Sequence, residues 1–261
     1  MLKREGYGVP EKKFGQSRIV TCFYHISVIR KCYLGGEKMS GQNQEYATRK
    51  TYFTAIVTVM AFITFMVIMY TINSGTEFSW EKPIQQYFQA WNVGGLHIFY
   101  TYWTELGSRI GIGLMTLLLV VWLWKTQQDY VAIAIVAIAV AATDRLNVFV
   151  KHLVARDRPA IDPSIDAVGY SFPSGHAMLS IITYSLVAFF LTRAIKEKGK
   201  QALIWLAAMI IIIVTGISRV VLSAHYPSDV IAGYCLGFVC LIITIKLYKL
   251  LHPLLKLKKK S

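Results

Sequence analysis

Six long apolar runs dominate the pattern of hydrophobic and polar positions along the chain. Each run is continuous and does not alternate with polar residues, which favours helices over strands. A helix needs ~20 residues to cross a bilayer, with a lower limit of roughly 17, and the second run is the shortest. The pattern therefore predicts an all-α, polytopic membrane protein with six transmembrane helices. Their expected limits are 52–72, 109–124, 130–150, 175–192, 202–218 and 228–247.

The segments between and beyond these runs are strongly basic. The net charge is +14, and ten lysines and arginines fall within residues 1–50. The loop 193–200 and the tail 251–261 are also basic, and six crossings would place all three segments on one side. Positive charge collects on the cytoplasmic side of membrane proteins. We therefore expect both termini to be cytoplasmic and the loops 73–108, 151–174 and 219–227 to face outward.

This pattern predicts three parts of the chain. Residues 1–50 would be a basic cytoplasmic tail, residues 51–250 a six-helix membrane domain, and residues 251–261 a second basic cytoplasmic tail. A disordered basic tail is the simpler interpretation of the N-terminal residues. Met39, followed by Ser and Gly, resembles a start of translation, which suggests the further hypothesis that residues 1–38 are an upstream extension without function. Loss of activity from a chain of residues 39–261 would refute that interpretation.

Composition excludes several other classes of protein. The chain is 55% hydrophobic with a mean hydropathy of +0.46, which is too apolar for an ordinary soluble domain. No basic-aromatic module is present, so nucleic acid is not an expected partner. The four cysteines show neither C-x-x-C pairing nor zinc spacing, and nothing implies disulfides; they are Cys22, Cys32, Cys235 and Cys240.

The segment 73–108 is rich in aromatic residues, which collect where lipid headgroups meet water. Residues 83–91 are expected to form a short helix lying in that interface. Such a helix could act as a lid or lateral gate for lipid entry, or it could simply anchor the protein. Anchoring is the simpler interpretation.

The stretch 218–229 carries the first candidate chemistry. Arg219, His225 and Asp229 place a cation, an imidazole and a carboxylate where two apolar runs end and begin. Charged groups beside a membrane span require a reason, and binding an anion is the simplest one. His225 and Asp229 could form a base and its orienting partner. A structural histidine at a helix end is the alternative that this stretch alone leaves open.

Two upstream stretches strengthen the anion-binding interpretation. Lys151 and Arg158 are separated by six residues, with Arg156 between them, and all three are interpreted as recruited for a ligand. Ser174 and Gly175 begin the fourth apolar run, where free backbone N–H groups and the helix dipole favour an anion. Ser-Gly is also a common helix start, but three such loops on one face make a shared anion site the better interpretation.

Together these stretches match, in order and spacing, the three signature motifs of the type 2 phosphatidic acid phosphatase family: Lys-x6-Arg-Pro, Pro-Ser-Gly-His and Ser-Arg-x5-His-x3-Asp. The chain resembles the bacterial integral-membrane branch, of the phosphatidylglycerophosphatase B or undecaprenyl-diphosphatase type. The resemblance covers residues 151–229. It implies a lipid phosphatase in the bacterial cell membrane, with its active site on the outer face.

The resemblance also implies a role for each motif residue. His225 would attack phosphorus and form a phosphohistidine, Asp229 would orient the imidazole, and His176 would protonate the leaving group before water hydrolyses the intermediate. The residues that would hold the phosphoryl oxygens are Lys151, Arg158, Ser174, Gly175, Ser218 and Arg219. The histidines that match no motif are interpreted as structural or interfacial; they are His25, His97, His152 and His252.

Several alternatives stay open. Two histidines and a carboxylate could hold a metal, but at least three cations nearby would repel a divalent ion, so we expect metal-independent hydrolysis with no cofactor. A non-catalytic lipid-phosphate binder or transporter, without an obligatory protein partner, is the competing class. Asp144 and Arg145 could pair with each other or support the site. The substrate could be phosphatidylglycerol phosphate, undecaprenyl diphosphate, phosphatidate or diacylglycerol diphosphate.

Overall fold

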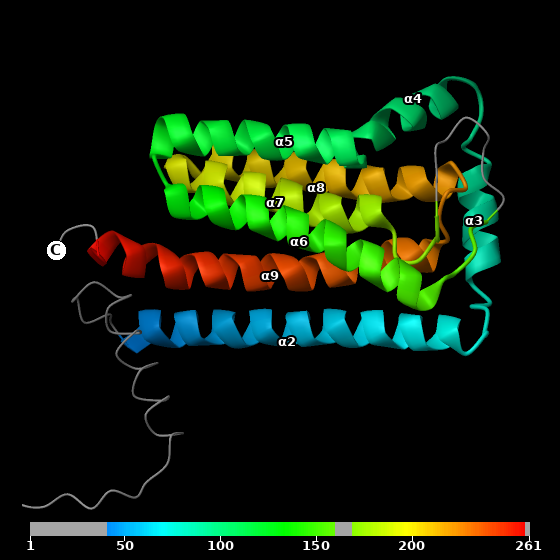
Figure 1. Ribbon diagram of the computed structural model, residues 1–261, viewed down its shortest axis with the longest axis horizontal. Helices are drawn as coiled ribbons and strands as arrows, with labels where there is room; N and C mark the ends of the chain where they lie inside the picture. Colours follow the sequence, from blue (N-terminus) through cyan, green and yellow to red (C-terminus); the bar gives the residue numbers. More distant parts are fainter. Residues whose placement is uncertain (1–40, 160–168, 259–261) are drawn as a thin grey trace, which may run out of the picture. The chain divides into compact units, whose positions relative to one another are not determined.

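The computed structural model describes residues 41–159 and 169–258 (Figure 1). The chain divides into two compact units, residues 1–51 and residues 52–261. The described part of the first unit, residues 41–51, is helical. The interpretation of residues 1–38 as an extension lies outside the described residues, as do the loop 160–168 and the end of the C-terminal tail. The site lies in the second unit.

Six long helices correspond to the six predicted spans. Each is long and apolar enough to cross a membrane, the second of them together with the turn at 123–127 that continues it. They are α2 (Gly41–Asn73), α5 (Arg109–Trp122), α6 (Tyr130–Val154), α7 (Gly175–Ala194), α8 (Lys198–Val221) and α9 (Pro227–Lys258). The described residues contain no strand. The prediction of an all-α protein with six membrane helices is thus confirmed. Several helices extend beyond the apolar runs because their polar ends continue the same backbone hydrogen bonding.

Side chains in the sequence set several helix limits. Ser108 caps α5 and Asp129 caps α6, each accepting a hydrogen bond from a backbone N–H of the first turn at 3.1 and 3.0 Å. A π turn, η2 (Leu123–Gln127), follows α5. Ala155 ends α6 with a left-handed φ of 49°, and its N–H donates to the Lys151 carbonyl. That turn redirects the chain toward the start of α7.

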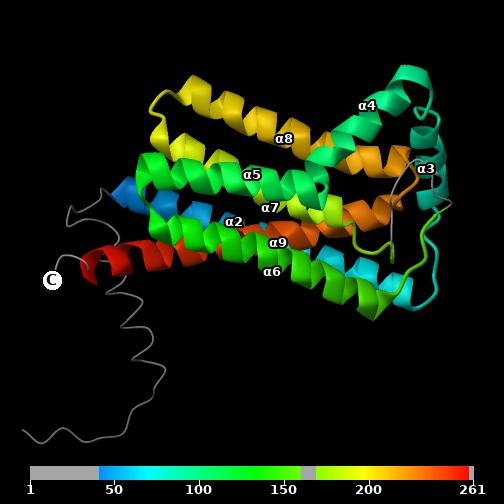
Figure 2. The same ribbon diagram turned by 45° about the horizontal axis from the view of Figure 1, so that its top comes forward.

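Helix α7 is the most buried of the six, packed between α8 and α9 and touching α5 and α6 (Figures 1 and 2). Two glycines of α9 allow the close approach. A Cβ at Gly233 would lie 2.6 Å from the Ser174 carbonyl oxygen, and one at Gly237 would lie 2.7 Å from that of Met178. Since neither distance is tolerable for real atoms, small residues here let the second and third turns of α9 pack closely against the start of α7.

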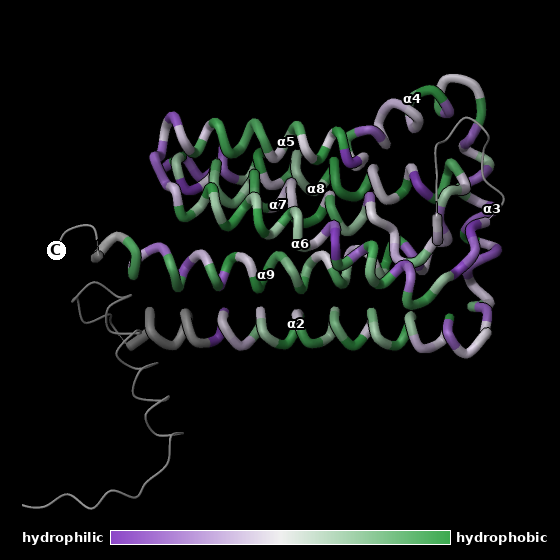
Figure 3. Tube along the Cα trace, viewed as in Figure 1, coloured by the Kyte–Doolittle hydropathy of each residue, from purple (hydrophilic) through white to green (hydrophobic). Residues whose placement is uncertain are grey.

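Two short helices lie at the end of the unit where α7 begins. Helix α3 (Glu81–Gln89) crosses the ends of the long helices and contacts α8 and α9, and α4 (Gly94–Thr104) contacts α8 (Figure 1). A single 3-10 turn, η1 (Glu105–Gly107), joins α4 to α5. The prediction of a short helix at 83–91 corresponds to α3, whereas α4 was not predicted. Hydrophilic residues gather around α3, while the long helices are mainly hydrophobic (Figure 3).

Candidate active site

Five helix ends enclose a cavity of about 580 Å³. They are the ends of α4, α6 and α8 and the starts of α5 and α7, and η1 and the loops after α6 and before α9 complete the lining. Six of the predicted site residues line the cavity: Lys151, Arg158, Gly175, His176, Arg219 and His225. The other three, Ser174, Ser218 and Asp229, are fully buried behind them.

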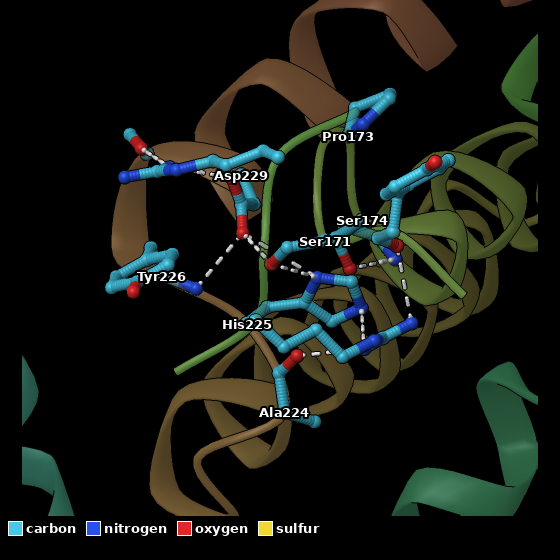
Figure 4. Close-up of polar contacts among 12 residues, drawn as sticks. Ser171, Pro173, Ser174, Ala224, His225, Tyr226 and Asp229 are labelled. Atoms are coloured by element: carbon cyan, nitrogen blue, oxygen red, sulfur yellow. Dashed lines mark hydrogen bonds and ion pairs between the residues drawn. The ribbon is translucent and has the colours of Figure 1, made fainter. Parts of the chain in front are cut away.

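His225 and Asp229 are packed together out of contact with solvent. The imidazole Nδ1 lies 3.6 Å from Oδ2 of Asp229, and the two residues are 2% and 0% exposed (Figure 4). This distance is longer than a hydrogen bond, so the carboxylate acts on the ring electrostatically. Oδ2 also accepts hydrogen bonds from the Ser171 hydroxyl and, at 3.0 Å, from the Tyr226 N–H. The carboxylate is thereby held beside Nδ1.

The other ring nitrogen of His225, Nε2, lies 3.4 Å from Nη1 of Arg158. Burial lowers the pKa of His225 well below its ordinary value, and the positive charges of Lys151, Arg219 and Arg158 lower it further. The imidazole is therefore neutral at pH 7. A neutral ring has one nitrogen with a free lone pair, and a proton on Nδ1, next to Asp229, leaves that lone pair on Nε2.

Three cations, Lys151, Arg158 and Arg219, form what we call the cation cluster. Lys151 Nζ donates to the Tyr170 carbonyl at 2.5 Å, and Arg158 donates to backbone carbonyls including that of Ala224 at 2.7 Å. Burial lowers the pKa of Arg158, although Asp229 partly offsets this effect. Backbone carbonyls thus hold two of the cations in place without neutralising their charge.

Arg219 is nearly fully buried, at 2% exposure. Its Nη1 donates to the Thr104 hydroxyl at 2.8 Å, whereas its buried Nε has no hydrogen-bond partner within the described residues. A buried donor without a partner is costly, and an anion in the cavity would satisfy it. Thr104 was not predicted as part of the site, because nothing in the sequence relates α4 to the end of α8.

The start of α7 supplies a further anion-binding feature. The Ser174 side chain accepts from the Ala177 N–H at 3.5 Å and so caps the helix. A Cβ added to Gly175 would lie 3.0 Å from Oδ1 of Asn147, so a larger residue would press on α6. Ser218 is not directed at the cavity; its hydroxyl donates to the Thr215 carbonyl at 2.7 Å.

Arg156 was predicted to bind the ligand as a cation, but the structure places it elsewhere. Its Nη1 donates to Oδ1 of Asp229 at 2.7 Å, and its Nη2 donates to Oε2 of Glu81 at 2.8 Å. The guanidinium also stacks over the Tyr226 ring, 3.9 Å from its centre. Arg156 is therefore paired behind the site and does not line the cavity. No sequence pattern indicated Glu81, which lies 75 residues away along the chain.

The two interpretations of Asp144 are both partly realised. Asp144 lines the cavity, where its Oδ1 lies 3.3 Å from Nε of Arg109, and its Oδ2 lies 3.9 Å from Nη2 of Arg145. Its nearer partner, Arg109, also lines the cavity and was not anticipated. Asp144 thus pairs weakly with Arg145 and more closely with a cation at the site.

The described histidines outside the motifs lie away from the cavity. His97 contacts Oδ1 of Asn92 at 2.7 Å, the His152 ring packs edge-on against Tyr170, and His252 contacts Asp129. His25 lies outside the described residues. Across residues 41–159 and 169–258, no group of three or more His, Cys, Asp or Glu side chains has a geometry that could hold a metal ion.

A known protein family shares the motif stretches that form this site. Residues 130–252 match the family model of the PAP2 superfamily, and all three motif stretches fall within that range. The family resemblance inferred from the motifs is thereby confirmed.

Two curated relatives share part of this domain. Phosphatidylglycerophosphatase B of Bacillus subtilis is 37% identical over 100 residues, which are 38% of this chain and 49% of that protein. An undecaprenyl-diphosphatase of Sulfolobus acidocaldarius is 37% identical over 68 residues, which are 26% of this chain and 29% of that protein. The chain therefore spans half or less of the length of the curated relatives it matches.

Two solved structures share the fold. A transmembrane PAP2-type phosphatidylglycerolphosphate phosphatase from Bacillus subtilis superposes with a TM-score of 0.62 and 24% identity, over 73% of this chain and 94% of that one. LpxE of Aquifex aeolicus superposes with a TM-score of 0.50 and 22% identity, over 65% and 97% of the two chains. Together with the six apolar helices, these likenesses establish a multi-pass membrane protein of the PAP2 fold.

Proposed function

We propose that the protein is a membrane lipid phosphatase that removes a phosphate through a phosphohistidine intermediate at His225. The observation that carries the proposal is a neutral, buried imidazole whose Nε2 lies at a cavity lined by the three members of the cation cluster. The names of the curated relatives, a phosphatidylglycerophosphatase and an undecaprenyl-diphosphatase, support the same class of substrate.

Binding comes first in this proposal. The phosphate takes the cavity between Lys151, Arg158 and Arg219, and Nε of Arg219, which has no partner in the described part of the chain, donates to one of its oxygens. The backbone N–H groups at the start of α7, beside Gly175, bind the same anion. Ser174 and Ser218 support the two helix ends. These donors neutralise the charge that builds on the non-bridging oxygens during transfer.

Two chemical steps follow. In the first, Nε2 of His225 forms a bond to phosphorus while the bond from phosphorus to the leaving oxygen breaks, and His176 gives its proton to that oxygen. Asp229 stabilises the positive charge that develops on the His225 ring. In the second, a water molecule attacks phosphorus while the bond from phosphorus to Nε2 of His225 breaks, His176 takes a proton from the water, and free phosphate leaves the regenerated imidazole. Both histidines line the same cavity.

We further propose that no metal takes part, because a divalent cation would be repelled by the cation cluster. The cavity opens at one end of the bundle, beside the ends of apolar helices. This position supports a substrate whose acyl or isoprenoid chains are buried in lipid. The protein would lie in the bacterial inner membrane, with the site facing outward and both termini in the cytoplasm. Residues 51–250 would form the phosphatase domain, flanked by the basic tails 1–50 and 251–261, with no obligatory protein partner.

The test is phosphate release by the purified full chain in detergent and EDTA. Phosphatidylglycerol phosphate and undecaprenyl diphosphate are supplied side by side, and His225→Ala serves as the control. We expect release that the variant loses, and the ratio of the two rates identifies the preferred substrate. A folded protein that binds either lipid but releases no phosphate would instead be a lipid-phosphate binder or transporter. Release that EDTA abolishes would contradict metal independence.

A further inference from the structure

A second ion-pair layer lies behind Asp229. Arg156 stands between two carboxylates, 2.7 Å from Oδ1 of Asp229 and 2.8 Å from Oε2 of Glu81. The Ser228 hydroxyl donates to Glu81 and accepts from Nη1 of Arg156 at 2.9 Å. Glu81 is 4% exposed and Asp229 is 0% exposed. The layer thus connects the first turn of α3, the loop after α6 and the first turn of α9.

The three charged groups of this layer influence one another. Two buried carboxylates share one guanidinium, so Asp229, Arg156 and Glu81 carry a net charge of −1. Burial alone would lower the pKa of Arg156, but Asp229 and Glu81 together raise it, so the guanidinium stays charged. A buried ion pair that loses one partner leaves an uncompensated charge, which is strongly unfavourable. Glu81 therefore competes with Asp229 for the same cation.

The two oxygens of Asp229 have different neighbours. Oδ1 is paired with Arg156, whereas Oδ2 accepts from Ser171 and Tyr226 and lies next to Nδ1 of His225. The more completely Arg156 neutralises Oδ1, the less negative charge the imidazole experiences. The competition between Glu81 and Asp229 consequently extends to His225.

We propose that Glu81 and Arg156 are positioning residues that set the effective negative charge of Asp229 and, through it, the protonation of His225. The assignment of His225 as the nucleophile rests on the proposed function, but the charge relation itself does not. Neither residue lines the cavity. They act on the reaction only through Asp229.

Other charged groups also face His225, and they stay unchanged when Glu81 or Arg156 is substituted. Lys151 approaches from α6, Arg158 from the loop after α6 and Arg219 from α8, and His176 faces the ring from α7. Asp229 is the carboxylate next to the ring, in the first turn of α9. Because these groups form a constant background, a change in the titration of His225 reports on the layer behind Asp229.

The sign of each expected change follows from the net charge. Arg156→Gln leaves the three positions at −2, which favours the imidazolium and raises the pKa of His225. Glu81→Gln leaves them at 0, which lowers that pKa. The double variant returns to −1 and restores it toward the starting value. The attacking ring must be neutral, so the acidic limb of kcat/KM moves to higher pH in Arg156→Gln and to lower pH in Glu81→Gln.

The experiment is a pH titration of the full chain in detergent, followed by NMR of 13C-labelled histidine rings, with His225→Gln used to assign the His225 signal. We expect opposite displacements in the two single variants, each of about half a pH unit or more, and recovery in the double variant. Arg156→Lys retains the charge and should displace the signal least. Displacements of the same sign, no displacement, or a double variant further from the starting value than either single one would overturn the proposal.

Two features keep this test decisive. If Arg156→Gln does not fold, Glu81→Gln decides alone, because only a downward displacement agrees with the proposal. The titration also needs no turnover. If the unsubstituted protein releases no phosphate but the displacements occur as expected, then the proposed function fails and the charge relation stands; if phosphate is released and the displacements are missing, the reverse holds.

Discussion

Two histidine–carboxylate pairs lie at opposite ends of helix α6, and their difference identifies the site. His225 and Asp229 are 3.6 Å apart beyond its C-terminal end, and His252 and Asp129 are 3.2 Å apart at its N-terminal end. By distance alone the second pair would be the stronger candidate. Its residues are more exposed, at 21% and 12% of their side chains, against 2% and 0% for the first.

The surroundings of the two pairs explain their different roles. Asp129 caps α6 and accepts a hydrogen bond from the Tyr248 hydroxyl at 2.8 Å, so its pair fastens the start of α6 to the end of α9. The pair at His225 lies beside a cavity lined by the cation cluster, in which the buried Nε of Arg219 has no hydrogen-bond partner among the described residues. A binding site contains charged groups that no protein group neutralises. In a structural pair, the two groups neutralise each other. Four substitutions test this distinction.

The largest effect is expected from His225→Ala. Removing a nucleophile from a hydrolase lowers kcat by about 10⁴-fold or more. Phosphate release should fall to background while helix content, followed by circular dichroism in detergent, stays unchanged. A variant that retains a tenth of the activity would remove His225 from the nucleophile's role.

His176→Ala should affect substrates according to their leaving groups. General acid catalysis contributes about 10²–10⁴-fold where the leaving alkoxide is a poor one. A nitrophenyl phosphate, whose leaving group needs no proton, should lose much less. The measurement is the ratio of kcat for the two substrates in the variant and in the unsubstituted protein. Equal losses on both would contradict the assignment of His176 as the acid.

Lys151→Ala removes one member of the cation cluster. The loss of one charge-assisted hydrogen bond, roughly 1.5–3 kcal/mol, corresponds to about 10–150-fold in kcat/KM. The matched control is Lys125→Ala, which removes an exposed lysine from the far end of the bundle. We expect the control to retain its activity. Similar losses in both variants would indicate a general effect of net charge rather than phosphate binding.

The smallest effect on activity is expected from His252→Ala. This substitution breaks the second pair, so kcat/KM should stay unchanged. The free energy of unfolding should fall by about 1 kcal/mol, as for one partly exposed hydrogen bond. Thermal unfolding in detergent measures the change in stability, and an activity assay measures kcat/KM. A loss of activity without a loss of stability would contradict this distinction, because it would give the pair of His252 and Asp129 a functional role.

The sequence predicted the helices well because lipid imposes a strong constraint on length and apolar character. Each of the six runs became a helix, and the motif stretches met at one end because odd and even spans alternate in direction. Helix α4 was not predicted, since its aromatic residues continue the pattern of an interfacial segment without a distinct limit.

The ion-pair layer shows why other parts of the site could not be predicted. Arg156 lies between Lys151 and Arg158, so the local pattern indicates a third phosphate-binding cation. Its carboxylate partner Glu81 is 75 residues away, beside the exposed Lys82, where a solvated helix face is the natural interpretation. Only the fold brings α3 against the start of α9. Pairing across such a separation leaves no periodic trace in one sequence.

Trapping the phosphohistidine would show whether His225 is the nucleophile. The full chain in detergent and EDTA is mixed with a 32P-labelled lipid phosphate, quenched in base within milliseconds, and digested for mapping of the label. We expect an acid-labile, base-stable phosphoryl group on His225 that is short-lived in the unsubstituted protein and absent from His225→Ala. Turnover at full rate without any label on His225, or label on another residue, would contradict the account.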